Sequence, residues 1–346
     1  MKEIKITKEI SGGRLDKIVS RYLDKAPKGF VYKMLRKKNI VLNDHKAQGK
    51  ELLKEGDCIR LYLADETIEK FRSTTKKSYE IKTENGPDPA EEYIVFEDEN
   101  LIAFNKPSGM LSQKAGKEDR SMNDLLIGHL AKTDAFGKET AESSDMKGFY
   151  TPGISNRLDR NTSGLILAGK NLNASRELNN ALKERRIDKY YLCLVKGKIT
   201  KKETIDGFLV KDERSNKVKI LKRGTDQKAA RILTAYEPLA GTEEITLLQV
   251  ELITGKSHQI RAHLASIGHP LLGDPKYGEP EANKKIREKY GLKRQALHAY
   301  KIFFREMNGT LSYLNGREIK APVPEDLAKI CKEIPELSDR KSIIRN

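Results

Sequence analysis

The sequence predicts an α+β protein, with a small α/β domain followed by a large domain whose mixed, mainly antiparallel sheet is flanked by helices and loops. Two observations lead to this class. From residue 93 onward, strand-like stretches dominate and helical stretches fall between them without regular alternation. A polar segment, residues 64–92, interrupts the chain, and 346 residues at roughly 150 per domain suggest about two domains.

The first predicted domain covers residues 1–63. Its N-terminus alternates like a strand, and a helical stretch then carries Leu15, Ile18 and Val19 on one side. A second helical stretch follows a break at residues 26–29. Short strands are expected at residues 40–42 and 57–63, so this unit is expected to be compact.

Residues 64–92 are polar and charged and end in a Pro- and Gly-containing stretch at 85–89. This composition predicts a linker that is partly disordered or extended. A short strand at residues 79–82 is compatible with the alternation there.

The large domain is expected to span residues 93–325, with residues 326–346 as a C-terminal tail and a polar insertion at 131–150. It opens with a candidate hairpin, and the other elements follow in chain order. The alternation of the strand at 245–253 changes phase at Leu247-Leu248, which predicts a β-bulge. The predicted elements are the hairpin strands 93–96 and 101–105, strand 165–168, helix 174–186, strand 190–195, strand 245–253 and helix 257–267.

The composition favours a polyanionic partner. The chain has 66 Lys and Arg against 50 Asp and Glu, a formal net charge of +16. Nucleic acid is the simplest partner for such a balance, although a basic surface also serves solubility. The three cysteines are far apart, which argues against a disulfide framework or a zinc site. Without a long apolar run or a signal peptide, we expect a cytoplasmic protein, and we expect it to be a monomer.

Cations cluster in the first domain. Rows of cations along helices can follow the phosphates of a folded RNA and gain from counterion release, but an ordinary solvated helix face has the same pattern. The order of residues in 12–63 resembles the small RNA-binding domain named after a ribosomal small-subunit protein, the S-four-like domain. The resemblance implies binding to structured RNA. The cations assigned to RNA binding are Arg14, Lys17, Lys33, Arg36, Lys37 and Lys38.

The most informative stretch surrounds Asp159. An Asp between Arg157 and Arg160 is, by itself, most simply a surface ion pair. Here, however, polar residues with loop character come directly before the apolar strand that starts at Leu165. Loops at strand ends commonly carry binding and catalytic residues.

The stretch from Arg157 to Leu165 closely resembles the catalytic loop of the RluA family of pseudouridine synthases, and the likeness extends over about residues 93–325. Four further segments match the family in the same order and a fifth follows them, which argues strongly against chance resemblance. They are residues 105–109, 189–197, 252–264, 268–278 and 295–299.

The resemblance implies the roles of three catalytic residues. Asp159 is expected to act as nucleophile or to stabilise the sugar intermediate, as carboxylates do in glycosidases. Arg261 is expected to pair with Asp159 and keep it ionised. Tyr191, rather than Tyr190, is expected to pack on the flipped base and to serve in proton transfer, although an aromatic on an alternating strand is ordinarily a core residue. Isomerising uridine requires no metal, redox cofactor or energy source.

Four residues of the large domain are assigned to RNA binding: Arg157, Arg160, Lys256 and His258. The first three are cations that could grip phosphates and offset the cost of flipping the uridine. His258, His263 and His269 have irregular spacing, which argues against zinc. The segment 105–109 is expected to shape the cleft floor.

Three positions depart from the family pattern and leave the target uridine open. They are Asn156, where the family often has His, Lys256, where Arg is common, and Ser112, which belongs to a divergent segment. The leading hypothesis is a pseudouridine synthase acting on ribosomal RNA, most simply that of the large subunit. A non-catalytic RNA-binding factor in ribosome assembly and a glycosidase-like enzyme are the alternatives.

Overall fold

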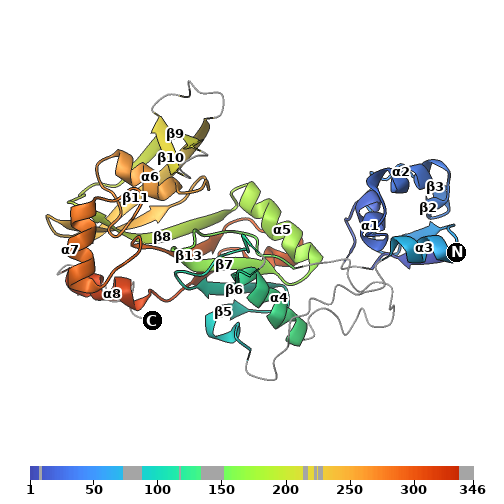
Figure 1. Cartoon of the computed structure of the whole chain (residues 1–346), viewed down its shortest axis with the longest axis horizontal. Coiled ribbons are helices and arrows are strands. Elements are labelled where there is room, and N and C mark those ends of the chain that lie inside the picture. Colours follow the sequence, from blue (N-terminus) through green and yellow to red (C-terminus); the bar gives the residue numbers. More distant parts are fainter. Residues whose placement is uncertain are drawn as a thin grey trace. The chain divides into compact units, whose positions relative to one another are not determined.

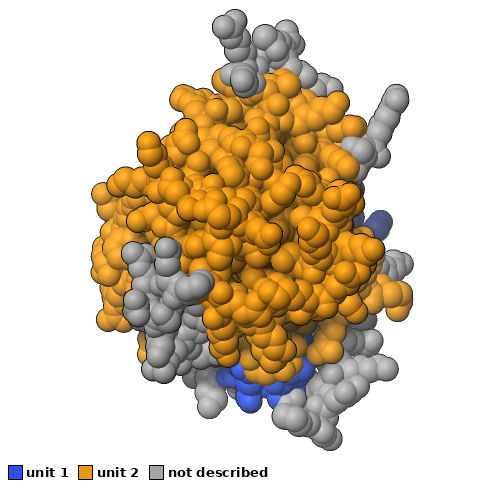
Figure 2. Space-filling view, turned by 90° about the vertical axis from the view of Figure 1, so that its left-hand side faces the viewer, with its two compact units in different colours: residues 1–91, 125–153, 169–177 blue, residues 92–124, 154–168, 178–346 orange. Residues whose placement is uncertain are grey.

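The computed structural model describes residues 1–7, 10–72, 88–116, 118–133, 152–212, 217–221, 224 and 229–334. These residues fall into two compact units, coloured separately in Figure 2. The first takes its described residues from 1–91, 125–153 and 169–177, and the second from 92–124, 154–168 and 178–346. The strand expected at 79–82 and most of the polar insertion at 131–150 lie outside the described residues.

The first unit contains a four-stranded antiparallel sheet in the order β1-β4-β2-β3 (Figure 1). Its N-terminal strands and helices occur where the sequence predicts them. Asn43 and Asp44, both with positive φ, form the tight turn between β2 and β3. The elements are β1 (Lys2–Lys5), α1 (Leu15–Tyr22), α2 (Lys28–Arg36), β2 (Ile40–Leu42), β3 (His45–Lys46), β4 (Cys58–Leu61) and α3 (Asp65–Phe71).

Helix α3 differs from the extended linker expected after residue 63. Ile68 of this helix is buried in the core of the first unit, and the ring of Phe71 lies 4.5 Å from that of Phe30. The N-terminal fold therefore continues to at least residue 71. Two apolar residues three apart are too weak a pattern to predict a helix of seven residues.

The second unit is built on a ten-stranded sheet in the order β10-β9-β11-β12-β8-β13-β7-β6-β5, with β14 beside β13 (Figure 1). The pairing of β13 with β7 is parallel, whereas β8, β11 and β12 pair antiparallel with their neighbours. This confirms the predicted α+β class with a mixed, mainly antiparallel sheet. The strands are β5 (Ile94–Glu97), β6 (Leu101–Lys106), β7 (Ser163–Gly169), β8 (Ile187–Lys196), β9 (Glu203–Asp212), β10 (Lys217–Leu221), β11 (Ala230–Gly241), β12 (Ile245–Glu251), β13 (Leu297–Phe304) and β14 (Glu318–Lys320).

The remaining helices are divided between the two units: residues 125–132 of α4 and 172–177 of α5 belong to the first unit, and α6, α7 and α8 belong to the second. Helix α6 packs against β9, β10 and β11, and α7 packs against α8 (Figure 1). None of the helices in the described ranges is long and apolar enough to cross a bilayer. The helices are α4 (Met122–Lys132), α5 (Leu172–Lys183), α6 (Gln259–Ser266), α7 (Pro280–Tyr290) and α8 (Glu325–Lys332), with short 3-10 turns η1 (Glu91–Tyr93) and η2 (Gly309–Leu314).

The residues expected to form a C-terminal tail begin instead with α8. Leu327, Ile330 and Cys331 of this helix are buried in the same core cluster as Leu292. They lie on one face because they are spaced by three and four residues. The core of the second unit therefore extends beyond the expected boundary at residue 325.

The predicted bulge is present, but on the partner strand. The register between β11 and β12 shifts between Pro238 and Ala240, which pair with Leu248 and Leu247. The extra residue is therefore Leu239 of β11, whereas the sequence placed the irregularity in β12.

Candidate active site

Two side chains fasten the loop that carries Asp159. Asn156 donates from Nδ2 to the carbonyl of Leu165 (3.0 Å) and accepts the Leu167 N–H at Oδ1 (2.8 Å). Ser112 is buried, and its Oγ both accepts the N–H of Leu158 and donates to the Leu158 carbonyl. Two of the three departures from the family pattern thus lie at positions that hold the loop to its own strand and to the neighbouring segment.

Lys106 lies beneath this loop and is fully buried. Its ammonium donates to three backbone carbonyls, those of Pro107 (2.9 Å), Met110 (2.9 Å) and Arg160 (3.0 Å). Burial lowers the pKa of Lys106 to about 7, with the positive charge of Arg294 acting in the same direction. Lys106 therefore ties the segment 105–109 to the loop, which agrees with the structural role expected for that segment.

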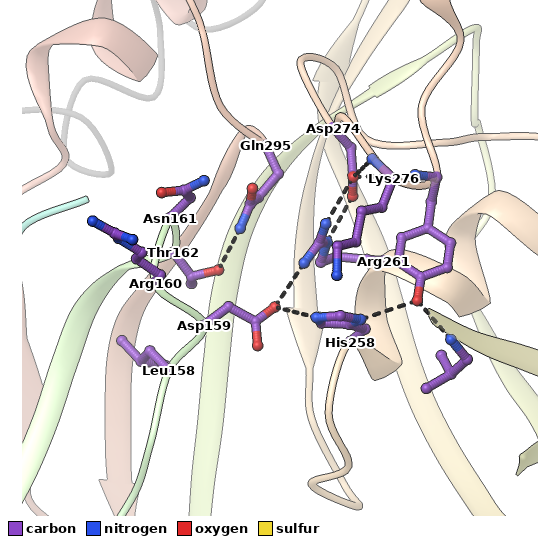
Figure 3. Close-up of polar contacts among 12 residues, drawn as sticks. Leu158, Asp159, Arg160, Asn161, Thr162, His258, Arg261, Asp274, Lys276 and Gln295 are labelled. Atoms are coloured by element: carbon purple, nitrogen blue, oxygen red, sulfur yellow. Dashed lines mark hydrogen bonds and ion pairs between the residues drawn. The ribbon is translucent and has the colours of Figure 1, made fainter. Parts of the chain in front are cut away.

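Asp159 and Arg261 meet as the sequence predicts. Arg261 Nη1 donates to Asp159 Oδ2 at 3.0 Å, and the Asp159 side chain is 28% exposed (Figure 3). Behind it, Arg261 binds Asp274 through Nε (2.7 Å) and Nη2 (2.8 Å). Because a two-point contact fixes the guanidinium plane, Asp274 sets the direction in which Nη1 points at Asp159.

Asp274 is fully buried. Burial alone would raise the pKa of this carboxyl, but the hydrogen bonds and charge of Arg261 and the backbone N–H groups of Lys276 and Tyr277 hold the pKa below its ordinary value. Asp274 is therefore ionised at neutral pH, and Arg261 is shared between two carboxylates.

Helix α6 carries Arg261 on its buried face and is anchored by Gln259. The amide Nε2 of Gln259 donates to the Leu233 carbonyl and to Thr234 Oγ1, both on β11. Its Oε1 accepts the hydroxyl of Thr254 and the N–H of Lys256. These contacts attach the first turn of α6 to the sheet and so place Arg261.

Tyr191 lies on β8 between β12 and β13 and is 6% exposed. Burial raises the pKa of its hydroxyl, and the negative charge of Asp159 raises it further. The hydroxyl is therefore protonated at neutral pH. Asp159 does not act in this way on Tyr190, whose neighbouring charges are Glu251, Asp188 and Arg305. Of the two tyrosines, only Tyr191 has a hydroxyl whose pKa is raised by the charge of Asp159.

The predicted RNA-binding residues of the second unit occupy different environments. Arg157, Arg160 and Lys256 are exposed around the loop and the start of α6. Arg160 Nε donates to the Gly109 carbonyl (2.9 Å), and Gly109 N–H donates to the Arg160 carbonyl. His258 is different: its side chain is 12% exposed and turns toward Asp159.

In the first unit, the predicted RNA-binding cations are all exposed on or beside α1 and α2. Arg14 pairs through two hydrogen bonds with Asp16, a buried carboxylate that also accepts from Tyr32. Lys38 has a positive φ of 59° just after α2. These cations are Arg14, Lys17, Lys33, Arg36, Lys37 and Lys38.

No individual role was predicted for Asp274, Lys106 or Tyr277, although Lys106 lies in the segment 105–109 that was expected to shape the cleft floor. Asp274 and Tyr277 lie within the matched segment 268–278, but the sequence does not say which cation they meet. The loop is also bound at Thr162, whose Oγ1 accepts from Gln295 Nε2 at 3.1 Å. Among the residues that the structure describes, no group of three or more His, Cys, Asp or Glu is placed to hold a metal ion.

Known proteins are similar to this chain in sequence and in fold. Residues 100–266 match the model of a family described as RNA pseudouridylate synthase. YlyB of Bacillus subtilis, an uncharacterized RNA pseudouridine synthase, is 33% identical over 250 residues, 71% of this chain and 74% of that protein. Ribosomal large subunit pseudouridine synthase C of Vibrio vulnificus is 27% identical over 332 residues, 96% of each chain. The solved structure of Human RNA Pseudouridylate Synthase Domain Containing 4 has the same fold, with a TM-score of 0.53 and 20% identity over 73% of this chain and 94% of that one.

Proposed function

The chain belongs to the RNA pseudouridylate synthase family, as its motifs predict, and on this premise we propose that it converts particular uridines of large-subunit ribosomal RNA to pseudouridine. Asp159 is the catalytic carboxylate, and Arg261 and Tyr191 complete the site. The reaction breaks the N1–C1′ bond of a uridine and joins C5 to C1′, so the atoms of the nucleotide are conserved.

The observation that carries this proposal is the orientation of the Asp159 carboxylate. Oδ2 accepts from Arg261 Nη1, whose direction is set by the buried Asp274. Among the described residues, none hydrogen-bonds Oδ1, so this oxygen is available to face the anomeric carbon. A carboxylate fixed in this way can attack C1′ or stabilise the positive charge that develops on the sugar.

Tyr191 supplies an aromatic surface in the same site. Because burial and Asp159 both raise the pKa of its hydroxyl, the residue is a neutral phenol at physiological pH. A neutral ring can pack on the extruded uracil, and its hydroxyl can hydrogen-bond the base. Extruding the uridine costs a few kcal/mol, which contacts of this kind offset.

The substrate class rests on relatives and on charge. Several similar proteins are named ribosomal large subunit pseudouridine synthase C or D. The exposed cations of α1 and α2 fit an S-four-like unit that grips structured RNA, and we propose that residues 1–63, extended by α3, serve this purpose. We infer that the reaction takes place in the cytoplasm.

The proposal is tested by incubating the purified chain with unmodified large-subunit ribosomal RNA and mapping pseudouridine by chemical labelling and reverse transcription. Pseudouridine is expected at a small number of discrete positions. Transfer RNA in a parallel reaction is the control. Modification of transfer RNA alone would contradict the ribosomal substrate, and no pseudouridine in either RNA would contradict the enzymatic activity.

A further inference from the structure

His258 stands where the loop and α6 meet, and its conformation is unusual. It is the residue before α6 and has a left-handed backbone with φ of 56°. Such a φ is uncommon for a residue with a side chain and is often retained at functional sites. The ring lies between two partners: Nδ1 is 3.0 Å from the hydroxyl of Tyr277, and Nε2 faces Asp159 Oδ2 at 3.9 Å (Figure 3).

The contacts of Tyr277 indicate which ring nitrogen carries the proton. The Tyr277 oxygen accepts the backbone N–H of Val218 at 2.8 Å. Its own hydrogen can then be donated to Nδ1 of His258, and the proton of the imidazole resides on Nε2. The Asp159 carboxylate favours the same arrangement because an N–H facing a negative oxygen is attracted to it.

The ring is a neutral donor at physiological pH. Burial lowers the pKa of His258, and the cations Arg261 and Lys276 lower it further, against the opposing charges of Asp159 and Asp274. A neutral imidazole that donates from one nitrogen can stabilise a developing anion without first losing a proton. The distance of 3.9 Å between His258 Nε2 and Asp159 Oδ2 is too long for a hydrogen bond, so the Nε2–H is available to another acceptor.

We propose that His258 is a catalytic residue whose Nε2–H donates a hydrogen bond to the uracil as it leaves C1′. This inference rests on the proposed function. When the N1–C1′ bond breaks, its electron pair goes to the base and spreads from N1 onto the O2 carbonyl. A donor beside Asp159 stabilises that charge while the carboxylate faces the sugar. Uracil then turns, C5 bonds to C1′ as the Asp159 carboxylate is released from C1′, the C5 proton passes to solvent and N1 takes up a proton from solvent.

The first test compares His258→Ala and His258→Gln with the wild type under single-turnover conditions on the mapped ribosomal RNA. Removing one donor to a developing anion is expected to slow His258→Ala about 100- to 1000-fold. His258→Gln restores an N–H donor of similar reach and should recover most of the rate. His269→Ala is the matched control, because that imidazole contacts the Lys196 carbonyl instead of Asp159.

The second test separates leaving-group stabilisation from a merely structural effect. RNA with 5-fluorouridine at the target has a base whose anion is intrinsically more stable, and fluorine at C5 prevents the later proton loss. The defect of His258→Ala in cleaving the N1–C1′ bond is therefore expected to be much smaller on this RNA than on uridine RNA. Tyr277→Phe, which keeps the ring and removes the hydroxyl that holds Nδ1, should show an intermediate defect with the same trend.

Equal defects on both RNAs, or a wild-type rate for His258→Ala, would overturn the assignment of His258. Either result with an active wild-type protein leaves the proposed function standing. Failure of the wild type to form pseudouridine would instead reject the proposed function.

Discussion

A single guanidinium connects the exposed and the buried carboxylates of the site. Arg261 uses Nε and Nη2 on Asp274, which is fully buried, and Nη1 on Asp159, which is partly exposed. Removing one partner of a buried ion pair leaves the other charge without compensation. We therefore expect the buried carboxylate of Asp274 to affect both the stability of the site and the position of Asp159.

Asp274→Asn is expected to lower kcat about 100-fold, since small displacements of reacting groups have effects of that size. It should also lower the free energy of unfolding by about 3 kcal/mol, because Arg261 loses a charged partner in the interior. Single-turnover kinetics and urea denaturation measure the two effects.

The Arg294–Asp326 pair provides a matched control. It has the same two-point geometry, but the Asp326 side chain is 36% exposed. Asp326→Asn should lower stability less and leave kcat unchanged. Equal losses of kcat in the two variants would contradict the positioning role of Asp274.

Asp159, Tyr191 and Arg261 could be proposed as catalytic residues from the sequence because they lie in ordered motifs. The residues that surround and hold them could not be identified from the sequence. Lys106 appears in the sequence as an ordinary lysine, a residue type that is almost never fully buried. Only the folded backbone shows three carbonyls converging on its ammonium.

At the level of elements, the loop depends on the close approach of β7 and β13. Gly164 has a φ of 116°, and a Cβ at this position would lie 2.2 Å from the Ala299 carbonyl oxygen. The three nearest atoms are all backbone atoms of Ala299, which cannot rotate away as a side chain can. The strand that follows the catalytic loop therefore requires glycine here.

Gly164→Ala is expected to lower the free energy of unfolding by about 3 kcal/mol, from overpacking together with the left-handed backbone. Gly29→Ala in α2 is the control, because a Cβ there meets nothing within 4 Å. The control should stay within about 1 kcal/mol of the wild type. Similar stability of the two variants in thermal or urea unfolding would mean that the space between β7 and β13 at Gly164 can hold a methyl group.

The sequence predicted about half of the elements; strands β9, β10, β11 and β13 and helices α4 and α7 were not among them, nor were the strand pairings. The phase change at Leu247-Leu248 located the bulge along the sheet, but a bulge in β11 disturbs the facing strand as well. A single strand's pattern cannot tell which partner holds the extra residue. Helices α3 and α8 were missed for a related reason: their short apolar faces are completed by residues distant in sequence.

For the whole molecule, buried imidazoles link stability to pH. His298 is buried between the Ser163 hydroxyl and the Ala321 carbonyl, and burial lowers its pKa to about 4. Burial also lowers the pKa of His263 to about 4. Both rings are neutral in the folded chain and titrate near 6.5 when unfolded.

Between pH 6.5 and 4, the unfolded chain therefore binds more protons than the folded chain, and stability falls as the pH is lowered. Each histidine is expected to contribute a slope of up to about 1.4 kcal/mol per pH unit in that window. Urea denaturation at a series of pH values measures it. His298→Gln should be less stable at pH 7 and show a shallower slope, whereas an unchanged slope would contradict the account of this residue.

RNA binding should depend on salt through the first unit. Neutralising four exposed cations at the end of α2 is expected to reduce the slope of log affinity against log salt by about 3. Each phosphate contact contributes about 0.7 to 0.9 to this slope. Filter binding to ribosomal RNA at several salt concentrations measures the slope. The substituted residues are Lys33, Arg36, Lys37 and Lys38, each replaced by Gln.

A control with the same change in net charge distinguishes local contacts from overall charge. Helix α7 and its surroundings offer four exposed cations for this purpose. If this control reduced the slope as much as the α2 variant, the assignment of RNA binding to α2 would be wrong. The control residues are Lys284, Lys285, Arg287 and Lys293, each replaced by Gln.

We propose that Asp159 carries out the chemistry on a uridine bound by the rest of the chain. Measuring pseudouridine formation and RNA affinity for Asp159→Asn beside the wild type tests this role. The amide keeps the size of the side chain and removes its charge. The variant is expected to bind the RNA with unchanged affinity and to form no pseudouridine. Pseudouridine formed at the wild-type rate by Asp159→Asn would contradict this role.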